Sequence, residues 1–266
     1  MPSQKSREVA GAYDALAADY DRLVEEDFWM RQLLWKRYLR LFPPGSRVLD
    51  VACGTGLDTL FLARAGIEAA GVDASPGMIG ELRAKAGRAG LSVDARVGDA
   101  ADLSAWPGGA FDGIVSAFAG LNTVDLERFA AEAHRVLRPG GRMVLHLLAP
   151  AGFWSVLRPL VRLRWREAQE VARRRELTTE ISGAPIRLTL LPALDTYRRW
   201  FAGRFALRRA CSLGFLWPRR ANALLPLRLR RVLGGLEPVL GALPVLRAAG
   251  RFFVLELERY DPAHAM

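Results

Sequence analysis

The segment that most constrains the fold is residues 48–56, which read Val-Leu-Asp-Val-Ala-Cys-Gly-Thr-Gly. A short apolar run contains Asp50 near its end, a glycine-containing turn follows, and from Leu57 onward apolar residues recur at helical spacing. Glycine permits a sharp turn and lets a ligand approach the backbone, and the free N–H groups of the next helix face the same space. The segment therefore predicts a strand, a tight turn and a helix, with a ligand site at the turn.

The rest of the first 150 residues predicts further alternation of strands and helices. Strands are expected near 46–51, 67–73, 92–98, 111–117 and 141–148, and helices near 57–65, 77–89 and 126–137. This alternation is typical of a parallel, doubly wound sheet with right-handed crossovers. Ligands of such sheets bind at the carboxyl ends of the strands.

Five segments in register resemble the motifs of class I S-adenosylmethionine-dependent methyltransferases. They are residues 48–56, 71–75, 97–100, 111–118 and 137–145. The resemblance covers roughly residues 10–150, and it is strongest to the small-molecule branch, which includes the ubiquinone and menaquinone methyltransferases. The alternative is a dinucleotide-binding domain, whose fingerprint is G-x-G-x-x-G. Here Ala52 stands at the first glycine position and no third glycine follows Gly56.

The resemblance implies an α/β, Rossmann-like fold with a doubly wound, seven-stranded, mostly parallel sheet, an antiparallel last strand and helical cap insertions. The expected parts are an N-terminal helical lid at 1–45, a cofactor-binding core at 46–150, a cap insertion at 151–192, a core helix and strand six at 193–216, a second helical cap at 217–250, and the last strand and tail at 251–266. Residues 1–10 are expected to be disordered, and 153–176 to be helical and basic.

The resemblance also implies how the cofactor, S-adenosylmethionine, is held. Asp50 matches the acid near the methionyl amine, Asp73 the acid that accepts hydrogen bonds from both ribose hydroxyls, and Asp99 the acid that reads the adenine amino group. A carboxylate suits the ribose because it is acceptor-only and can receive two donors. The other expected cofactor contacts are Tyr20, Ala52, Gly54, Gly56, Ala74, Met78, Ala100, Ser116 and Ala117. No metal is expected.

Methyl transfer is an in-line displacement, and its leaving group is a neutral thioether that needs no acid. Some oxygen or carbon acceptors also require removal of a proton, and a base that does this should lie at the cleft. His146, in the expected fifth strand, is the catalytic candidate if its side chain faces the cleft, and a buried core histidine if it does not. The acceptor pocket is expected to include Tyr13, Trp29, Phe118 and Tyr197.

The charge is distributed unevenly along the chain. Residues 1–150 hold 17 basic and 19 acidic residues, whereas residues 151–266 hold 21 and 9, and all 21 are arginine. A basic half indicates polyanions, phosphorylated substrates or anionic membrane as partners, or arginines that are simply solvated. Arginine and leucine alternate at helical spacing in 153–166 and 219–233, which is typical of helices that lie at a membrane interface.

The predicted function is transfer of a methyl group from S-adenosylmethionine to a small-molecule or lipid-like acceptor. We expect a cytoplasmic protein, because there is no early signal peptide, no uncharged apolar run of about 18 residues and only two cysteines, Cys53 and Cys211. Peripheral contact with anionic membrane is a further hypothesis.

Two alternatives remain open. One is an RNA- or ribosome-directed methyltransferase that holds phosphates with the basic half. The other is a cofactor-binding protein without turnover. Nucleic acid is disfavoured as a partner because the arginines are interleaved with leucine rather than with stacking aromatics. Residues 116–119, after the expected fourth strand, also lack the Asn-Pro-Pro-Tyr or Asp-Pro-Pro-Tyr run of adenine and glutamine N-methyltransferases.

Overall fold

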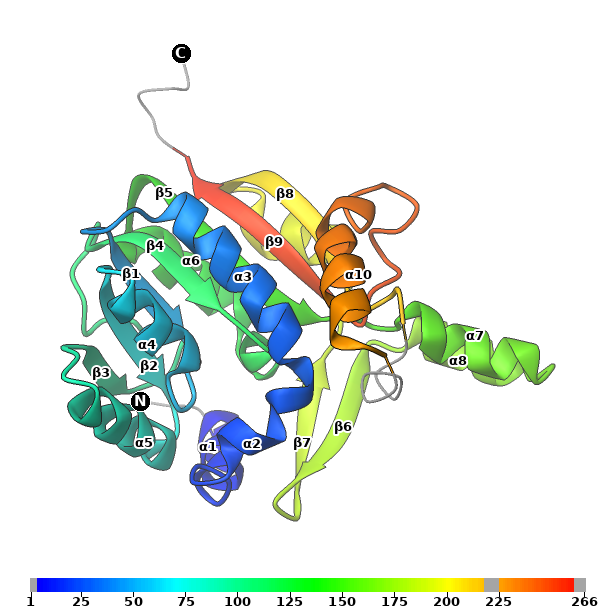
Figure 1. The fold of residues 1–266 in the computed structure, drawn as a ribbon, viewed down its shortest axis with the longest axis horizontal. Coiled ribbons are helices and arrows are strands. Elements are labelled where there is room, and N and C mark those ends of the chain that lie inside the picture. The colour runs from blue at the N-terminus through cyan, green and yellow to red at the C-terminus, as the bar shows by residue number, and fades with distance from the viewer. Residues whose placement is uncertain (1–3, 218–224, 261–266) are drawn as a thin grey trace.

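The computed structural model describes residues 4–217 and 225–260, and a seven-stranded sheet lies at its centre (Figure 1). The strands are β1 (Arg47–Val51), β2 (Glu68–Asp73), β3 (Asp94–Val97), β4 (Phe111–Ser116), β5 (Leu137–Leu148), β8 (Phe205–Leu213) and β9 (Phe252–Arg259), and their order across the sheet is β3-β2-β1-β4-β5-β9-β8. β1 to β5 pair in parallel, and β9 pairs antiparallel with both β5 and β8. The predicted fold class is confirmed.

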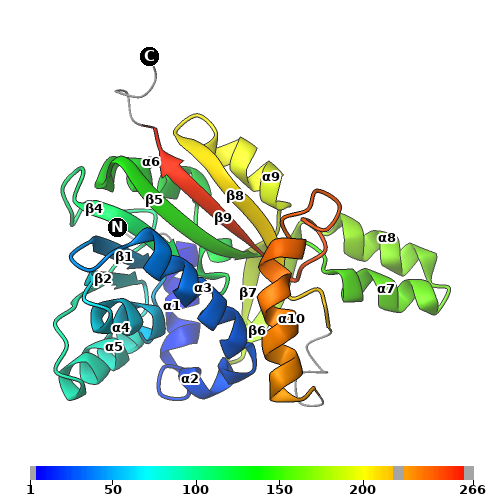
Figure 2. The ribbon, with the colours of Figure 1, turned by 45° about the horizontal axis from the view of Figure 1, so that its top comes forward.

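Helices cover both faces of the sheet (Figure 2). One face carries α3 (Phe28–Leu41), α4 (Leu57–Arg64) and α5 (Pro76–Arg88), and the other carries α6 (Leu126–Val136) and α9 (Ala193–Thr196), which a π-helical turn, Tyr197–Phe201, extends. The start of α5 shows the local chemistry: Ser75 Oγ accepts the Met78 N–H at 3.0 Å, and Pro76 occupies the first turn, where its missing N–H costs nothing.

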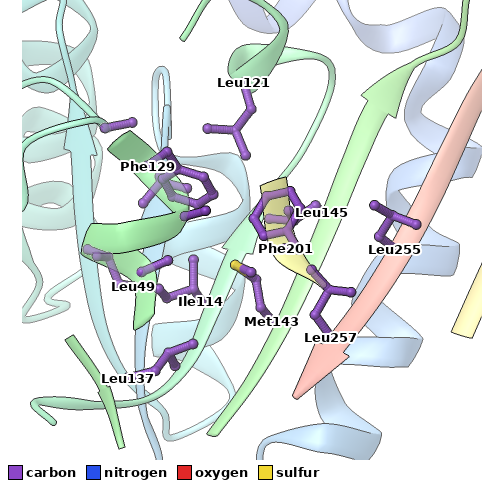
Figure 3. Packing of buried hydrophobic residues seen from close by; sticks show 14 of the residues in the cluster. Leu49, Ile114, Leu121, Phe129, Leu137, Met143, Leu145, Phe201, Leu255 and Leu257 are labelled. Atoms are coloured by element: carbon purple, nitrogen blue, oxygen red, sulfur yellow. The ribbon is translucent and has the colours of Figure 1, made fainter. Parts of the chain in front are cut away.

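Neighbouring residues of the central strands supply the two cores on opposite faces. Leu49, Ile114 and Leu145 pack with Phe129 of α6 in one cluster (Figure 3). Their immediate neighbours, such as Val48, point to the other cluster, beneath α3. Successive side chains of a strand alternate between faces, so strands covered on both sides read as continuous apolar runs. This is why the sequence pattern identifies these strands.

The amino-terminal segment forms α1 (Gln4–Asp14), α2 (Tyr20–Leu23) and a short 3-10 turn (Glu25–Asp27). The expectation of disorder over residues 1–10 is therefore wrong for the described residues 4–10. Ala12 of α1 is buried with Ile186, Leu188 and Leu190, and Val9 packs against them. The contact joins α1 to residues about 180 positions later in the chain and orders this helix. The polar composition of α1 does not predict that order.

Two hairpins fill the expected first cap. α7 (Phe153–Val161) and α8 (Trp165–Arg173) form a helical hairpin, and β6 (Glu176–Ile181) and β7 (Ala184–Thr189) form a β-hairpin. Residues 153–176 are thus helical as expected over most of their length, but they form two helices, because the chain turns at Leu163, whose φ is 58°. Figures 1 and 2 show α7 and α8 projecting away from the rest of the molecule.

The second expected cap contains α10 (Leu227–Leu240). Part of that cap and of the 219–233 stretch, residues 218–224, lies outside the described residues, as does the tail from 261 to 266. A 3-10 turn, Gly120–Thr123, completes the core after β4. Over residues 4–217 and 225–260, we find no helix with the length and apolar character needed to cross a membrane.

Candidate cofactor-binding site

A cleft lies where β1, β2 and β4 end, beneath α1, and encloses about 720 Å³ when the space open to solvent is counted. Nine of the twelve predicted cofactor-binding residues line it: Tyr20, Ala52, Gly54, Asp73, Ala74, Met78, Asp99, Ala100 and Ala117. Tyr13 and Phe118, two of the expected acceptor-pocket residues, also line it. The structure thus gathers segments distant in sequence into one cleft; that these residues bind a cofactor stays a prediction.

The turn after β1 forms one wall of the cleft. Ala52, Gly54 and Gly56 all have left-handed backbones, with φ of 53°, 55° and 82°. A Cβ added to Gly54 would lie 3.6 Å from the Tyr20 ring. Glycine at this position therefore leaves the backbone open toward the cleft, and it adopts the left-handed conformation without the cost that a side chain brings.

Asp73, the last residue of β2, is fixed by two backbone donors. Its Oδ2 accepts the Gly54 N–H at 2.8 Å and its Oδ1 accepts the Ser75 N–H at 3.0 Å. Burial raises the pKa of this carboxyl, and the same two N–H groups oppose that rise. The side chain is an oriented acceptor that links the ends of β1 and β2.

Asp99 stands after β3 at another part of the cleft. Its Oδ1 accepts the Ala101 N–H at 2.9 Å and its Oδ2 accepts the Ser6 hydroxyl of α1 at 2.6 Å. Ser6 was not predicted, because the segment that carries it was expected to be disordered. The hydroxyl of the lid helix therefore occupies one lone pair of an acid that the resemblance assigns to the adenine.

Two acids of the lid, which sequence reasoning missed, attach it to the core. Asp14 Oδ1 accepts hydrogen bonds from Ser75 Oγ and from the Gly77 N–H. Asp21 accepts from Thr55 Oγ1 and from Lys85 Nζ. The signal available in the sequence is the pair Tyr13-Asp14 and Tyr20-Asp21, in which each tyrosine of the cleft is followed by an acid.

The two tyrosines meet over the cleft. The Tyr13 and Tyr20 rings lie edge to face with centroids 6.2 Å apart. Burial raises the pKa of both hydroxyls, and the Asp73 carboxylate contributes to the rise at Tyr13. Both phenols are therefore neutral at physiological pH and present polar hydroxyls on aromatic rings.

Three predicted cofactor contacts lie behind the cleft rather than on its surface. Asp50 is 1% exposed and its Oδ2 accepts the Thr59 hydroxyl at 2.7 Å. Burial raises the pKa of Asp50 to about 7, although the Thr59 hydrogen bond and the Arg31 charge oppose the shift. Gly56 packs against Leu82 of α5, and Ser116 is 1% exposed. In this structure these residues shape the cleft from beneath.

Arg31 is a buried cation beside this region that sequence reasoning did not single out. It is 4% exposed, forms an ion pair with Asp58, and lies over the Phe118 ring at 4.5 Å from the centroid. Trp35 Nε1 also donates to Asp58, at 2.8 Å. The sequence signal is weak: one arginine beside Met30, Leu34 and Tyr38, the apolar stripe of α3.

His146 takes the core position of the two that the sequence left open. It is 1% exposed, its ring contacts Phe118 and Phe252, and it does not line the cleft. Burial lowers the pKa of His146 to about 3, and the charges of Arg31 and Arg251 contribute. In this structure the ring is a buried histidine behind Phe118, and its role as a catalytic base stays a prediction.

Trp29 and Tyr197 do not reach the cleft either. Trp29 packs against Trp217, with ring centroids 4.7 Å apart, where α3 meets α10. Tyr197 follows α9, and its hydroxyl donates to the Phe205 carbonyl at 3.0 Å. Neither ring lines the cleft in this structure, and their assignment to the acceptor pocket stays a prediction. The acceptor-pocket candidates that remain at the cleft are Tyr13 and Phe118.

The cleft fits the cofactor that the resemblance implies. It offers an oriented carboxylate for hydroxyl groups at Asp73, apolar surface at Val72 and Met78 for an adenine ring, and a second acid at Asp99. Among the described residues, no group of three or more His, Cys, Asp or Glu side chains is placed to hold a metal. The side chains present therefore match a nucleoside with hydroxyl and amine donors.

Comparison with known proteins identifies the same region. Residues 48–141 match a family model described as "Methyltransferase domain". A demethylmenaquinone methyltransferase of Symbiobacterium thermophilum is 34% identical over 155 residues, which are 54% of this chain and 60% of that protein. A ubiquinone biosynthesis O-methyltransferase of Xanthomonas axonopodis pv. citri is 34% identical over 116 residues, 43% of this chain and 48% of that protein. The chain thus spans less than two thirds of these relatives' length.

Solved structures share the fold at lower sequence identity. A methyltransferase of Methanosarcina mazei superposes with a TM-score of 0.57 at 19% identity, covering 83% of this chain and 95% of that one. The [4+2]-cyclase SpnF superposes with a TM-score of 0.56 at 21% identity, covering 85% and 80%. At these identities the likeness shows the fold alone. Residues 48–141 are therefore a class I S-adenosylmethionine-dependent methyltransferase domain.

Proposed function

We propose that this chain transfers a methyl group from S-adenosylmethionine to a small-molecule or lipid-like acceptor. The observation that carries the proposal is the carboxylate of Asp73, held at the end of β2 by the Gly54 and Ser75 N–H groups and lining the cleft of a methyltransferase domain. An acceptor-only group in a fixed orientation suits paired hydroxyl donors.

The chain's own residues bind and orient the reactants, and the proton that an oxygen or carbon acceptor loses on methylation is proposed to pass to water in the cleft. The cofactor, when bound, supplies a methyl group on a sulfonium. Asp73 and Asp99 supply acceptors, Met78 and Val72 supply apolar surface, and Tyr13 of α1 contributes to the wall of the cleft. Holding two reactants in line can supply up to about 7–11 kcal/mol of a barrier without acid or base. We therefore propose positioning as the main catalytic device.

The acceptor is proposed to be flat and apolar, such as a quinone precursor. Val9, Tyr13, Phe118 and Val124 line the cleft, which gives it apolar and aromatic surface apart from its two acids. The relatives named above carry the names of demethylmenaquinone and ubiquinone enzymes, which supports this substrate class. An acceptor of that kind partitions into lipid, so peripheral contact with an anionic membrane belongs to the proposal.

Calorimetric titration with S-adenosylhomocysteine tests the cofactor site. Asp73→Ala should weaken binding about ten- to hundredfold, because a hydrogen bond to a charged group contributes about 1.5–3 kcal/mol. Asp94→Asn is the matched control: Asp94 lies on the neighbouring strand β3, pairs with Arg96 and does not line the cleft. An unchanged dissociation constant for Asp73→Ala would show that Asp73 does not bind the cofactor.

A second measurement separates an enzyme from a binding protein without turnover. Purified protein is incubated with S-adenosylmethionine and a demethylated quinone precursor, and the release of S-adenosylhomocysteine is followed. Release that needs both the acceptor and Asp73 supports the proposed function. Tight binding with no release from any quinone precursor supports the alternative of a cofactor-binding protein.

A further inference from the structure

The tip of the α7–α8 hairpin presents apolar side chains to solvent. Val161, Leu163 and Trp165 are 74%, 74% and 61% exposed, and every residue from 161 to 167 is exposed. Figures 1 and 2 show the hairpin extending away from the sheet and its covering helices. Single exposed apolar residues are common on protein surfaces, but three within five residues at a projecting tip form a patch that folding does not require.

The backbone conformation at the tip is also strained. Leu163 has a φ of 58°, in the left-handed region that glycine or asparagine normally occupies. Its side chain is exposed, so it contributes little packing that would offset the strain. Glycine would adopt this conformation without strain, so we infer that the exposed leucine serves a contact outside the folded protein.

Arginines flank and alternate with the exposed apolar residues. The order at the tip is Val161-Arg162-Leu163-Arg164-Trp165-Arg166, and the hairpin with its edges, residues 153–175, holds seven arginines and two glutamates. Glu167 pairs with Arg164 at 3.3 Å, and both side chains are more than half exposed. The patch is therefore apolar at its centre and cationic at its margin.

We propose that the α7–α8 hairpin docks the protein on an anionic lipid bilayer, inserting Val161, Leu163 and Trp165 at the level of the headgroups while Arg162, Arg164 and Arg166 meet lipid phosphates. Tryptophan suits this depth because it combines a large apolar ring with an N–H donor. Arginine suits phosphate because its planar donors can bind two oxygens at once. The positive margin matches the charge of the proposed surface.

The α7–α8 hairpin would make the membrane contact of the proposed function. The proposal rests on that function only for the reason why the protein would bind a membrane. Vesicle binding is measured without turnover and without cofactor. Failure to bind vesicles would leave the affinity for S-adenosylhomocysteine untouched, and loss of that affinity would leave vesicle binding untouched. The two proposals can therefore fail separately.

The test is co-sedimentation with vesicles of phosphatidylglycerol and phosphatidylcholine in equal parts, against vesicles of phosphatidylcholine alone, at low and high salt. At low salt the wild-type protein should partition to anionic vesicles at least about tenfold more strongly than to neutral ones, and high salt should reduce the difference. Val161→Ser/Leu163→Ser/Trp165→Ser should lose most of this binding. Arg162→Gln/Arg164→Gln/Arg166→Gln should lose the preference for anionic vesicles.

A control variant replaces three exposed apolar residues elsewhere on the surface. Leu23, Leu39 and Val97 are 49%, 48% and 49% exposed and lie outside the hairpin. Leu23→Ser/Leu39→Ser/Val97→Ser should bind anionic vesicles within about twofold of wild type. Thermal melting and S-adenosylhomocysteine titration of each variant show that it is folded.

Fluorescence quenching by brominated lipid locates the tip. Quenching of the wild-type protein should fall in Trp165→Phe, which keeps an apolar side chain and should still sediment with vesicles. The proposal is overturned if wild type ignores anionic vesicles at low salt, or if the serine variant binds them as wild type does. It is also overturned if the tip instead mediates self-association that the serine variant abolishes in sedimentation velocity, because the partner would then be a second copy of the chain.

Discussion

The Nδ1 atom of His146 accepts a hydrogen bond from the backbone N–H of Phe118 at 3.2 Å. The carbonyl of the same histidine accepts from the Ala119 N–H, also at 3.2 Å. Phe118 and Ala119 have positive φ values of 53° and 66°, so His146 holds a strained pair of residues at the edge of the cleft. Because Nδ1 is an acceptor, the neutral ring carries its proton on Nε2. His146 therefore positions Phe118 and Ala119, the residues that follow β4.

The first prediction concerns the pH dependence that His146 gives to stability. The pKa of His146 is lowered by burial to about 3, against an ordinary value of 6.5. Between these values the unfolded chain binds a proton that the native protein does not, so the free energy of unfolding falls as the pH falls below 6.5. From pH 7.5 to pH 5 this loss is up to about 2 kcal/mol.

His146→Phe should remove that contribution while other groups titrate alike in both proteins. Urea unfolding at pH 7.5 and pH 5 measures the difference between wild type and variant at each pH. His134→Gln is the comparison, since His134 is only partly buried and should contribute less. Equal pH slopes for wild type and His146→Phe would contradict a buried neutral ring.

The second prediction has the opposite sign. Burial raises the pKa of Asp50 to about 7, from an ordinary 3.8, so the native protein binds more protons than the unfolded chain between these values. The stability that Asp50 contributes is full below pH 3.8 and is lost as the pH rises through 7. Asp50→Asn abolishes this titration, so the free energy of unfolding of the variant, relative to wild type, should be about 2–3 kcal/mol higher at pH 8 than at pH 5. Chemical unfolding without cofactor measures it, and a pH-independent difference would refute it.

The third prediction compares two glycines. A Cβ on Gly56, where φ is 82°, would overlap Leu82 Cδ1, whereas a Cβ on Gly80 of α5 meets nothing within 4 Å. Gly56→Ala should therefore destabilise the protein by about 1–3 kcal/mol through backbone strain and overpacking. Gly80→Ala should stabilise it by about 0.5–1 kcal/mol through helix propensity. Melting temperatures of both variants check the pair, and a melting temperature for Gly56→Ala equal to wild type would contradict the close packing.

The sheet and the cleft were predictable from sequence because their signals are local. Continuous apolar strands and left-handed glycines leave a pattern within a few residues, as at 48–56. The face on which His146 lies also follows from alternation with Leu145 and Leu147, which belong to the same core cluster. The alternation does not tell which face of the sheet adjoins the cleft, because the cleft lies at the ends of the strands rather than on one face.

Other features depend on contacts between residues distant in sequence, or on strained backbone conformations that the local sequence does not reveal. The order of α1 comes from packing against β7, about 180 residues later. The break between α7 and α8 falls at Leu163, where neither glycine nor asparagine marks a left-handed turn. Trp29 packs against Trp217, in the segment after β8, and Tyr197 donates to the Phe205 carbonyl of β8, so the place of each ring depends on contacts that only the fold determines.

The last prediction concerns the lid. Asp21 of α2 accepts from Thr55 of the cofactor turn and from Lys85 of α5, which also donates to the Thr55 carbonyl at 3.2 Å. The Asp21–Lys85 pair is partly exposed, so its loss should cost little stability, about 0–1 kcal/mol. Because the contacts join the lid to the turn beneath it, Asp21→Ala should speed dissociation of S-adenosylhomocysteine several-fold, with a smaller effect on association. Stopped-flow fluorescence measures both rates. Asp19→Ala is the matched control, since Asp19 precedes the same helix and pairs with the exposed Arg22. Unchanged dissociation in Asp21→Ala, or an equal increase in Asp19→Ala, would show that these contacts do not hold the lid closed.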